Sequence, residues 1–428
     1  MNINNLNTYP TNQLSKQKFS CRCGETHEIS SNIAFDDVEN TIEHYIEKIV
    51  PPLSLISILY DLSSRQKYER TIDKKLGNFG FRVNPQVCKQ GEKIAQKISE
   101  DTRLILGVGN HRHLNEVKQL AFLLNLPYAL VPTCPSSHLQ SLIPSYQKSD
   151  QGCIEIFKSP PPNLLLCEND WKGNTPQAGS YFSLISAKLV SLFDYQASAS
   201  LNGEKFCFEI FDQALSIIDE SIEQTLGATN QFELERILKE NLVRYGALCQ
   251  LKGNTRLALG AETLAAKIFS SLTYYNGDNI GENEFLFARI LMRLYLNYLE
   301  NKTEFFTPPP SNNKRVQLIS KYFKIPEQIA LKNIRPVPNA HKESLSSYKL
   351  KIHRDELFAL ATEFDSKLTL AYSALKKLYL DEGYSFTNYL GKNEATISVA
   401  LAPDFMQKFT LLSFMKDRGL LEGMLNDS

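Results

Sequence analysis

The sequence predicts an α/β N-terminal dinucleotide-binding-like domain followed by an all-α helical domain. Short apolar segments alternate with amphipathic ones up to residue 172, as in strands alternating with helices. From Gly179 onward the spacing of apolar residues is helical and stays so. Residues 104–136 form one complete strand, glycine turn, helix and strand pattern. The expected divisions are a disordered leader over 1–18, the α/β domain over 19–172 and the helical domain over 173–428.

The segment 104–136 is the clearest supersecondary unit. An apolar run ends in Gly107-Val108-Gly109, apolar residues then recur at three- and four-residue spacing, and a second apolar run stops at Pro132. Such a βαβ unit has a right-handed crossover. Glycines after the first strand can let a phosphate approach the N–H groups of a helix N-terminus. A tight turn without a ligand explains the same glycines equally well.

Composition restricts the classes of protein that remain. The chain has 428 residues, enough for two domains, and its 43% hydrophobic and 22% charged residues are ordinary for a globular protein. Lys+Arg and Asp+Glu both number 47, which argues against a global electrostatic grip on nucleic acid. No apolar run reaches the roughly 18 residues of a membrane span, and the N-terminus has no apolar signal-peptide core. The eight scattered cysteines indicate reduced thiols in a cytoplasmic protein.

The first motif along the chain is Cys21-Arg22-Cys23 with His27. Two thiols and an imidazole could form half of a zinc site. No second cysteine pair lies at the spacing of a zinc finger, so a turn leading into a strand is the preferred interpretation.

The following elements build the α/β domain. Residues 36–49 have the pattern of an amphipathic helix, and 53–60 that of a buried strand ending at Asp61. An acidic residue at the carboxyl end of a strand can accept hydrogen bonds from ribose hydroxyls, or it can cap the next helix. Both roles fit Asp61. Further helices are expected at 66–77 and 90–100. Further strands are expected at 80–87, 154–157 and 163–167.

The second half of the chain has helical periodicity. Helices are expected within 183–195, 208–226, 233–251, 263–272, 284–299, 356–380 and 405–421. Residues 325–352 hold two prolines in a short stretch and are expected to be an irregular connection.

Four separated segments share one pattern. They are Cys21-Arg22-Cys23-Gly24 with His27; Gly107-Val108-Gly109 with VPTCPS at 131–136; Gly253-Asn254-Thr255-Arg256 with Gly260-Ala261-Glu262; and FTLL at 409–412 with GLL at 419–421. In order and spacing they resemble the sn-glycerol-1-phosphate dehydrogenase family, within the dehydroquinate synthase and iron-containing alcohol dehydrogenase superfamily. Residues 315–400 are an extension that the family pattern does not contain.

The resemblance implies an active site in a cleft between the two domains. Family members use NAD(P)H to reduce dihydroxyacetone phosphate, and a divalent metal polarises the ketone. On this basis the candidate catalytic residues are Lys188, Arg256, Glu262 and His138. The candidate cofactor-binding residues are Asp61, Gly107, Gly109, Thr133 and Ser136.

The sequence departs from the family at the metal. The family holds its ion with one Asp and two His, and these positions fall on Leu184, Thr263 and Asn276. No histidine occurs between His138 and His341. Leucine has no lone pair, and neutral Thr and Asn oxygens are poor ligands for zinc or nickel, so no metal is expected.

The phosphate turn departs as well. The family's G-V-G-S-G-T-x-x-D reads here as Gly107-Val108-Gly109-Asn110-His111-Arg112-His113-Leu114-Asn115. His111 places a side chain where a pyrophosphate needs close approach. His111, Arg112 and His113 could instead bind an anion in another pose, or form a solvated helix start.

Three functions from different classes fit these residues. The chain is a working glycerol-1-phosphate dehydrogenase-like oxidoreductase, a pseudoenzyme that serves as a binding or assembly module, or an enzyme of different chemistry in the same cleft. Substitution of all three ligands favours loss of metal-dependent hydride transfer. We therefore expect weak NAD(P) binding and, as partners, a small phosphorylated ketone or alcohol and further copies of the chain, without nucleic acid.

Overall fold

The structure is a computed structural model that describes residues 3, 6, 9–89, 98–150, 153–169, 177–273, 280–301, 311–336, 340–381, 391–406 and 408–421. The chain divides into two compact units. Unit 1 contains residues 1–148, 156–181 and 229–255, and unit 2 contains 149–155, 182–228 and 256–428. The division is therefore not a single cut at residue 172, because residues 229–255 lie in unit 1.

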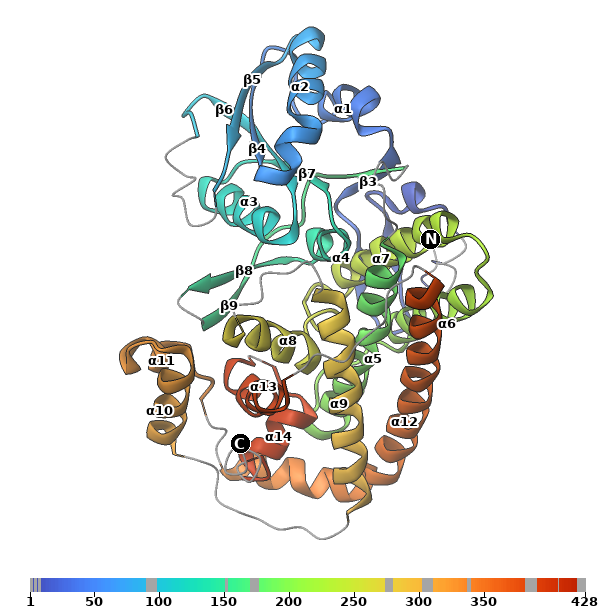
Figure 1. The fold of residues 1–428 in the computed structure, drawn as a ribbon, viewed down its shortest axis with the longest axis vertical. Helices are drawn as coiled ribbons and strands as arrows, with labels where there is room; N and C mark the ends of the chain where they lie inside the picture. The colour runs from blue at the N-terminus through green and yellow to red at the C-terminus, as the bar shows by residue number, and fades with distance from the viewer. Residues whose placement is uncertain are drawn as a thin grey trace. The chain divides into compact units, whose positions relative to one another are not determined.

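A six-stranded parallel sheet forms the centre of unit 1 (Figure 1). In spatial order its strands are β3 (Asn32–Asp36), β10 (Leu164–Glu168), β7 (Tyr128–Pro132), β6 (Thr102–Gly109), β4 (Leu55–Tyr60) and β5 (Arg82–Val87). The central strands are mostly apolar and are buried over nearly their whole length, as expected where both faces of a parallel sheet are covered.

Among the described residues of unit 1, five α-helices pack together with the sheet: α1 (Val38–Ile46), α2 (Leu62–Phe79), α3 (His111–Leu124), α4 (Pro135–Leu142) and α7 (Gln231–Lys252). α1 and α2 pack against each other, α3 covers β6 and β7, and α4 packs against α3 and α7. One cluster of buried residues joins the faces of α1 and α2 to the sheet, including Ile42, Tyr68, Leu76, Ile58 and Leu106.

The strand order reverses between β4 and β6. β5 follows β4 on one side, and the chain then crosses to β6 on the other side of β4. Open α/β sheets bind ligands at such a point, outside the carboxyl ends of the strands. β4, β6 and β7 all end at this edge. It therefore carries the end of the expected strand 53–60, the glycine turn and the start of the segment after Pro132.

The N-terminal part of unit 1 is more ordered than the sequence predicted. Residues Thr11–Leu14 form a 3₁₀ helix (η2) with Thr11 and Leu14 buried, and β1 (Lys18–Ser20) pairs antiparallel with β2 (Thr26–Glu28). The expected leader over 1–18 is therefore too long, because burial of these side chains compensates the entropy of ordering a polar segment.

Helices form unit 2, apart from residues of the small β8–β9 sheet (Ser145–Asp150 and Cys153–Lys158). They are α5 (Ala178–Asn202, from residue 182), α6 (Phe208–Gly227), α8 (Ala261–Leu272), α9 (Ile280–Glu300), α10 (Asn312–Phe323), α11 (Glu327–Asn333), α12 (Ala340–Asp381), α13 (Lys392–Phe405) and α14 (Leu411–Asp417). α8 packs between α9 and α13, and α12 runs along α9 and α6 (Figure 1). Within the described residues, no helix is long and apolar enough to cross a bilayer.

The prediction of an irregular connection over residues 325–352 is wrong. Residues Glu327–Asn333 form α11, and α12 begins at Ala340. Pro326 precedes α11 at its N-cap, where a proline does not break the helix. Pro336 follows α11, and Pro338 lies outside the described residues. The described part of the 315–400 extension is thus largely helical.

Candidate functional site

Asp61 joins two strand ends at the point where the sheet order reverses. Its carboxylate accepts hydrogen bonds from the Ser64 backbone N–H (2.7 Å) and the Ser63 hydroxyl (2.9 Å), which caps α2. The other carboxylate oxygen accepts from the Asn110 backbone N–H at 2.7 Å. Burial by itself raises the pKa of Asp61, but these hydrogen bonds outweigh it and hold the pKa below 3.8. Of the two roles open from sequence, the capping role is observed.

Two glycines of the turn allow close packing within unit 1. A Cβ on Gly109 would lie 2.7 Å from both the Asp61 carboxylate and the His113 ring. A Cβ on Gly107 would lie 2.9 Å from Val117 of α3. Neighbouring side chains of the protein thus leave no room for a Cβ atom at either glycine.

The N-terminus of α3 is capped by its own chain. The Asn110 side-chain oxygen accepts from the backbone N–H groups of Arg112 (3.1 Å) and His113 (3.2 Å). An anion at this helix end would compete with that cap for the same donors. The buried His113 ring reaches the Leu59 carbonyl at 2.9 Å, and burial lowers its pKa below 6.5. His113 is therefore a packed structural residue and does not form a solvated helix start.

The segment after β7 lies at the same edge of the sheet. The Ser136 hydroxyl is 3.0 Å from Nδ1 of His111, and the Ser64 hydroxyl donates to the Thr133 hydroxyl at 3.4 Å. Four of the five candidate cofactor-binding residues, Asp61, Gly109, Thr133 and Ser136, thus lie at the carboxyl edge of the parallel sheet. Gly107 lies deeper, below α3.

His138 is buried in unit 1 with 3% of its surface exposed. Nδ1 lies 2.9 Å from the Cys134 carbonyl and 3.3 Å from the Tyr181 hydroxyl. Burial lowers the pKa of His138 to about 3, with a further contribution from the Lys239 charge. A ring that stays neutral at neutral pH suits a structural histidine better than the acid or base expected from sequence.

Unit 2 contains a buried ionic cluster around Lys188. The Nζ atom donates to Glu284 (2.5 Å), Thr263 (2.8 Å) and Glu262 (3.2 Å). All four side chains are at most 1% exposed. Burial lowers the pKa of Lys188, but the Glu284 and Glu262 carboxylates outweigh it, so the pKa rises above 10.5 and the ammonium persists. An ammonium has three N–H donors, and all three have partners here.

The two described positions that the resemblance assigns to the family's metal ligands lack the carboxylate and imidazole groups that zinc prefers. Leu184 is a buried apolar side chain, and Thr263 is bonded to the Lys188 ammonium. Asn276 lies outside the described residues. Leu184 adds no donor atom, and the Lys188 ammonium already bonds Thr263 and the neighbouring Glu262 and Glu284 carboxylates.

Arg256 lies in a different set of contacts of unit 2. Its guanidinium bonds the Glu204 carboxylate, with one N···O distance of 2.9 Å, and donates to the Phe409 carbonyl at 2.7 Å. Nearby, Asp194 accepts from the Leu411 backbone N–H at 2.9 Å. Burial raises the pKa of Asp194 to about 7. Glu262, the remaining candidate, lies with Lys188, so the structure brings these two together.

Three residues that make contacts in these sites were not among the candidates selected from the sequence: Asn110, Glu204 and Glu284. Asn110 could have been found, because an Asn directly before a helical pattern is an N-cap signal. Glu284 and Glu204 carry no such signal: each is one acidic residue among many on a helical stripe or in a turn.

Comparison with known proteins places the fold. The chain is 12% identical to the archaeal halo-thermophilic Red Sea brine pool alcohol dehydrogenase, with a TM-score of 0.55 over 94% of this chain and 98% of that one. It is 24% identical over 272 residues to the glycerol-1-phosphate dehydrogenase [NAD(P)+] of Halalkalibacterium halodurans, covering 58% of this chain and 66% of that protein. The enzyme of the same name from Metallosphaera sedula is 24% identical over 198 residues, which cover 44% of this chain and 55% of that protein. The matches thus span less than two thirds of either relative, and no family model matches.

The parallel sheet and the helical part match an alcohol dehydrogenase-like fold. In sequence the chain is similar to glycerol-1-phosphate dehydrogenases, at 24% identity to each of these two relatives.

Proposed function

We propose that this chain is a glycerol-1-phosphate dehydrogenase-like protein that binds NAD(P) weakly and no longer carries out metal-dependent hydride transfer. The observation that supports this most is the Lys188 ammonium bonded to Thr263, at a ligand position of the family. The ammonium forms ion pairs with both Glu262 and Glu284, so a cation of the protein itself already lies beside this position.

The same cluster argues against a metal-free reduction that uses Lys188. An electrophile must aim a donor at the oxygen where negative charge develops. Each N–H of Lys188 already has an acceptor, and the side chain is 1% exposed. Freeing one donor would cost a buried hydrogen bond to Glu262, Glu284 or Thr263.

The carboxyl edge of the sheet in unit 1 supports residual nucleotide binding. Ser136 and Thr133 offer hydroxyls there, in the usual position of a ligand in an open α/β sheet. Asn110 and His111 reduce what the α3 N-terminus can offer to a pyrophosphate. A small phosphorylated ketone or alcohol is the substrate class that the family suggests.

The test is a turnover assay with dihydroxyacetone phosphate and NADH or NADPH, with and without added zinc or nickel. The relative from Halalkalibacterium halodurans serves as the active control. We expect no oxidation of NAD(P)H that depends on dihydroxyacetone phosphate, and weak NAD(P)H binding by calorimetry. Turnover that increases with added metal would overturn the proposal. Turnover independent of metal would instead support the alternative of different chemistry on this scaffold.

A further inference from the structure

The N-terminal hairpin of unit 1 gathers three side chains that bind soft metals. β1 and β2 pair antiparallel, and Phe19 lies opposite His27. The connecting loop carries Cys21 and Cys23. Gly24 has φ of +80°, a left-handed conformation that favours glycine, and its N–H donates to the Cys21 carbonyl at 3.2 Å. The hairpin therefore turns both thiols back toward His27.

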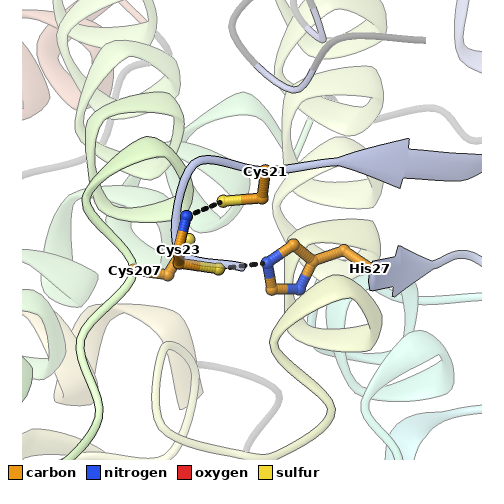
Figure 2. A group of neighbouring side chains, drawn as sticks. All are labelled: Cys21, Cys23, His27 and Cys207. Carbon is orange, nitrogen blue, oxygen red and sulfur yellow. Dashed lines mark hydrogen bonds between the residues drawn. The ribbon is translucent and has the colours of Figure 1, made fainter. Parts of the chain in front are cut away.

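The ligand atoms are close enough to share one ion. The Cys21 and Cys23 sulfurs and the His27 ring nitrogens offer one ligand atom each, all within 4.8 Å of one another. Cys23 Sγ is 3.2 Å from His27 Nε2. Two ligands of a tetrahedral zinc ion with bonds of 2.0–2.3 Å lie about 3.5–3.8 Å apart. Figure 2 shows the three side chains converging, and also draws Cys207 of unit 2.

His27 is oriented as a metal ligand would be. Its Nδ1 lies 2.6 Å from the Leu251 carbonyl, in the last turn of α7. A carbonyl only accepts, so Nδ1 carries the proton and Nε2 presents its lone pair toward Cys23. Metal-binding histidines characteristically donate their second ring N–H to a carbonyl or carboxylate in this way. His27 is 3% exposed, so this orientation is fixed by packing.

A backbone contact suits a thiolate at Cys21. Its sulfur accepts a hydrogen bond from the Cys23 backbone N–H at 3.4 Å. The thiolate is the form of cysteine that binds metal. Both cysteines are partly exposed, which leaves an entry path for an ion.

We propose that Cys21, Cys23 and His27 bind a zinc ion that joins the β1–β2 hairpin to the C-terminal end of α7. Two thiolates and an imidazole favour zinc over magnesium or calcium, which prefer oxygen ligands. The residues of this site are different from those that the resemblance assigns to the family's catalytic metal in unit 2. It revises both the expectation that the protein binds no metal and the preference for a simple turn at Cys21–His27.

The test measures metal on the full chain, independently of any turnover. Protein purified without chelator should contain one zinc per chain by elemental analysis. Cys21→Ser with Cys23→Ser, and His27→Gln, should each reduce the zinc content at least tenfold. Cys88→Ser, which removes another buried thiol of unit 1, should retain it.

Cobalt substitution keeps the proposal testable if a variant fails to fold. Cobalt(II) bound to the unmodified protein should show thiolate charge-transfer absorption and the visible bands of a tetrahedral site. Absence of both zinc and the cobalt spectrum in the unmodified protein would overturn the proposal. So would full zinc content in the folded double cysteine variant. Neither result depends on NAD(P)H oxidation, so the proposed function stands or fails separately.

Discussion

The Nζ atom of Lys188 donates a hydrogen bond to the Thr263 hydroxyl over 2.8 Å. Lys188 lies on α5 and Thr263 on α8, and both are buried in unit 2. The contact places a fixed positive charge at a position where the family places a metal-binding imidazole. Glu262 and Glu284 depend on that charge, because each carboxylate is buried.

Removing the Lys188 charge should strongly destabilise the protein. Lys188→Met leaves two buried carboxylates uncompensated, and breaking a buried pair in this way costs about 3–5 kcal/mol. Urea unfolding measures the change. The matched control is Lys367→Met, whose ion pair with Asp219 is partly exposed and should contribute about 0–1 kcal/mol. Equal effects of the two substitutions would contradict the role of the cluster.

Because of Lys118, the free energy of unfolding should change with pH in the alkaline range. Its buried ammonium donates to the Gln140 and Ile143 carbonyls, and burial lowers its pKa from 10.5 to about 7. Between these values the unfolded chain holds a proton that the folded protein has released. Stability attributable to Lys118 therefore rises with pH, by up to about 1.4 kcal/mol per unit, and is lost as pH falls toward 7.

The comparison with Lys118→Met isolates this effect, because other alkaline groups titrate in both proteins. Urea unfolding at several pH values between about 7 and 10 should show the unmodified protein gaining stability relative to the variant. A constant difference across the range would mean that Lys118 does not titrate there.

Gly109 should not tolerate a methyl group. Gly109→Ala places a Cβ 2.7 Å from the Asp61 carboxylate and the His113 ring, and such overpacking typically costs about 1–3 kcal/mol. Gly77→Ala in α2 is the matched control, since no atom lies within 4 Å of its Cβ position. There alanine should stabilise the helix by about 0.5–1 kcal/mol. Thermal unfolding of both variants distinguishes close packing from backbone effects.

Opening the α3 N-terminus should tighten nucleotide binding. Asn110→Gly with His111→Gly removes the side-chain cap and the ring, while glycine at an N-cap costs only a few tenths of a kcal/mol. One or two recovered charge-assisted hydrogen bonds of about 1.5–3 kcal/mol each would improve NAD(P)H affinity at least tenfold in calorimetry. Asn230→Gly, which removes the equivalent cap of α7, should leave affinity unchanged. No change in the double variant would indicate that this edge does not bind the pyrophosphate.

Thiol reactivity offers a check on the cysteines. The sequence contains eight, and none of the seven whose side chains the structure describes is in a disulfide. Titration in denaturant with chelator should count eight thiols with or without reductant. In the folded protein the Cys21 and Cys23 thiols should react slowly until a chelator removes zinc. A count lower by two without reductant would indicate a disulfide.

Local sequence patterns determined the α/β unit and its carboxyl edge. The apolar run, the glycines and the helical spacing of 104–136 depend on residues a few positions apart, so periodicity shows them directly. The same holds for Asp61, whose place after a strand indicated a capping or binding role. The helix α11 escaped prediction because a proline can precede a helix as readily as interrupt one.

Tertiary structure alone decided what the candidate residues do. Lys188 meets Glu284 across 96 positions, and His27 meets the Leu251 carbonyl across 224. Local periodicity indicates which face of a helix is buried, but not which distant polar groups meet there. Desolvation then sets their chemistry, because a buried charge or imidazole must take its partner from whatever the fold places beside it.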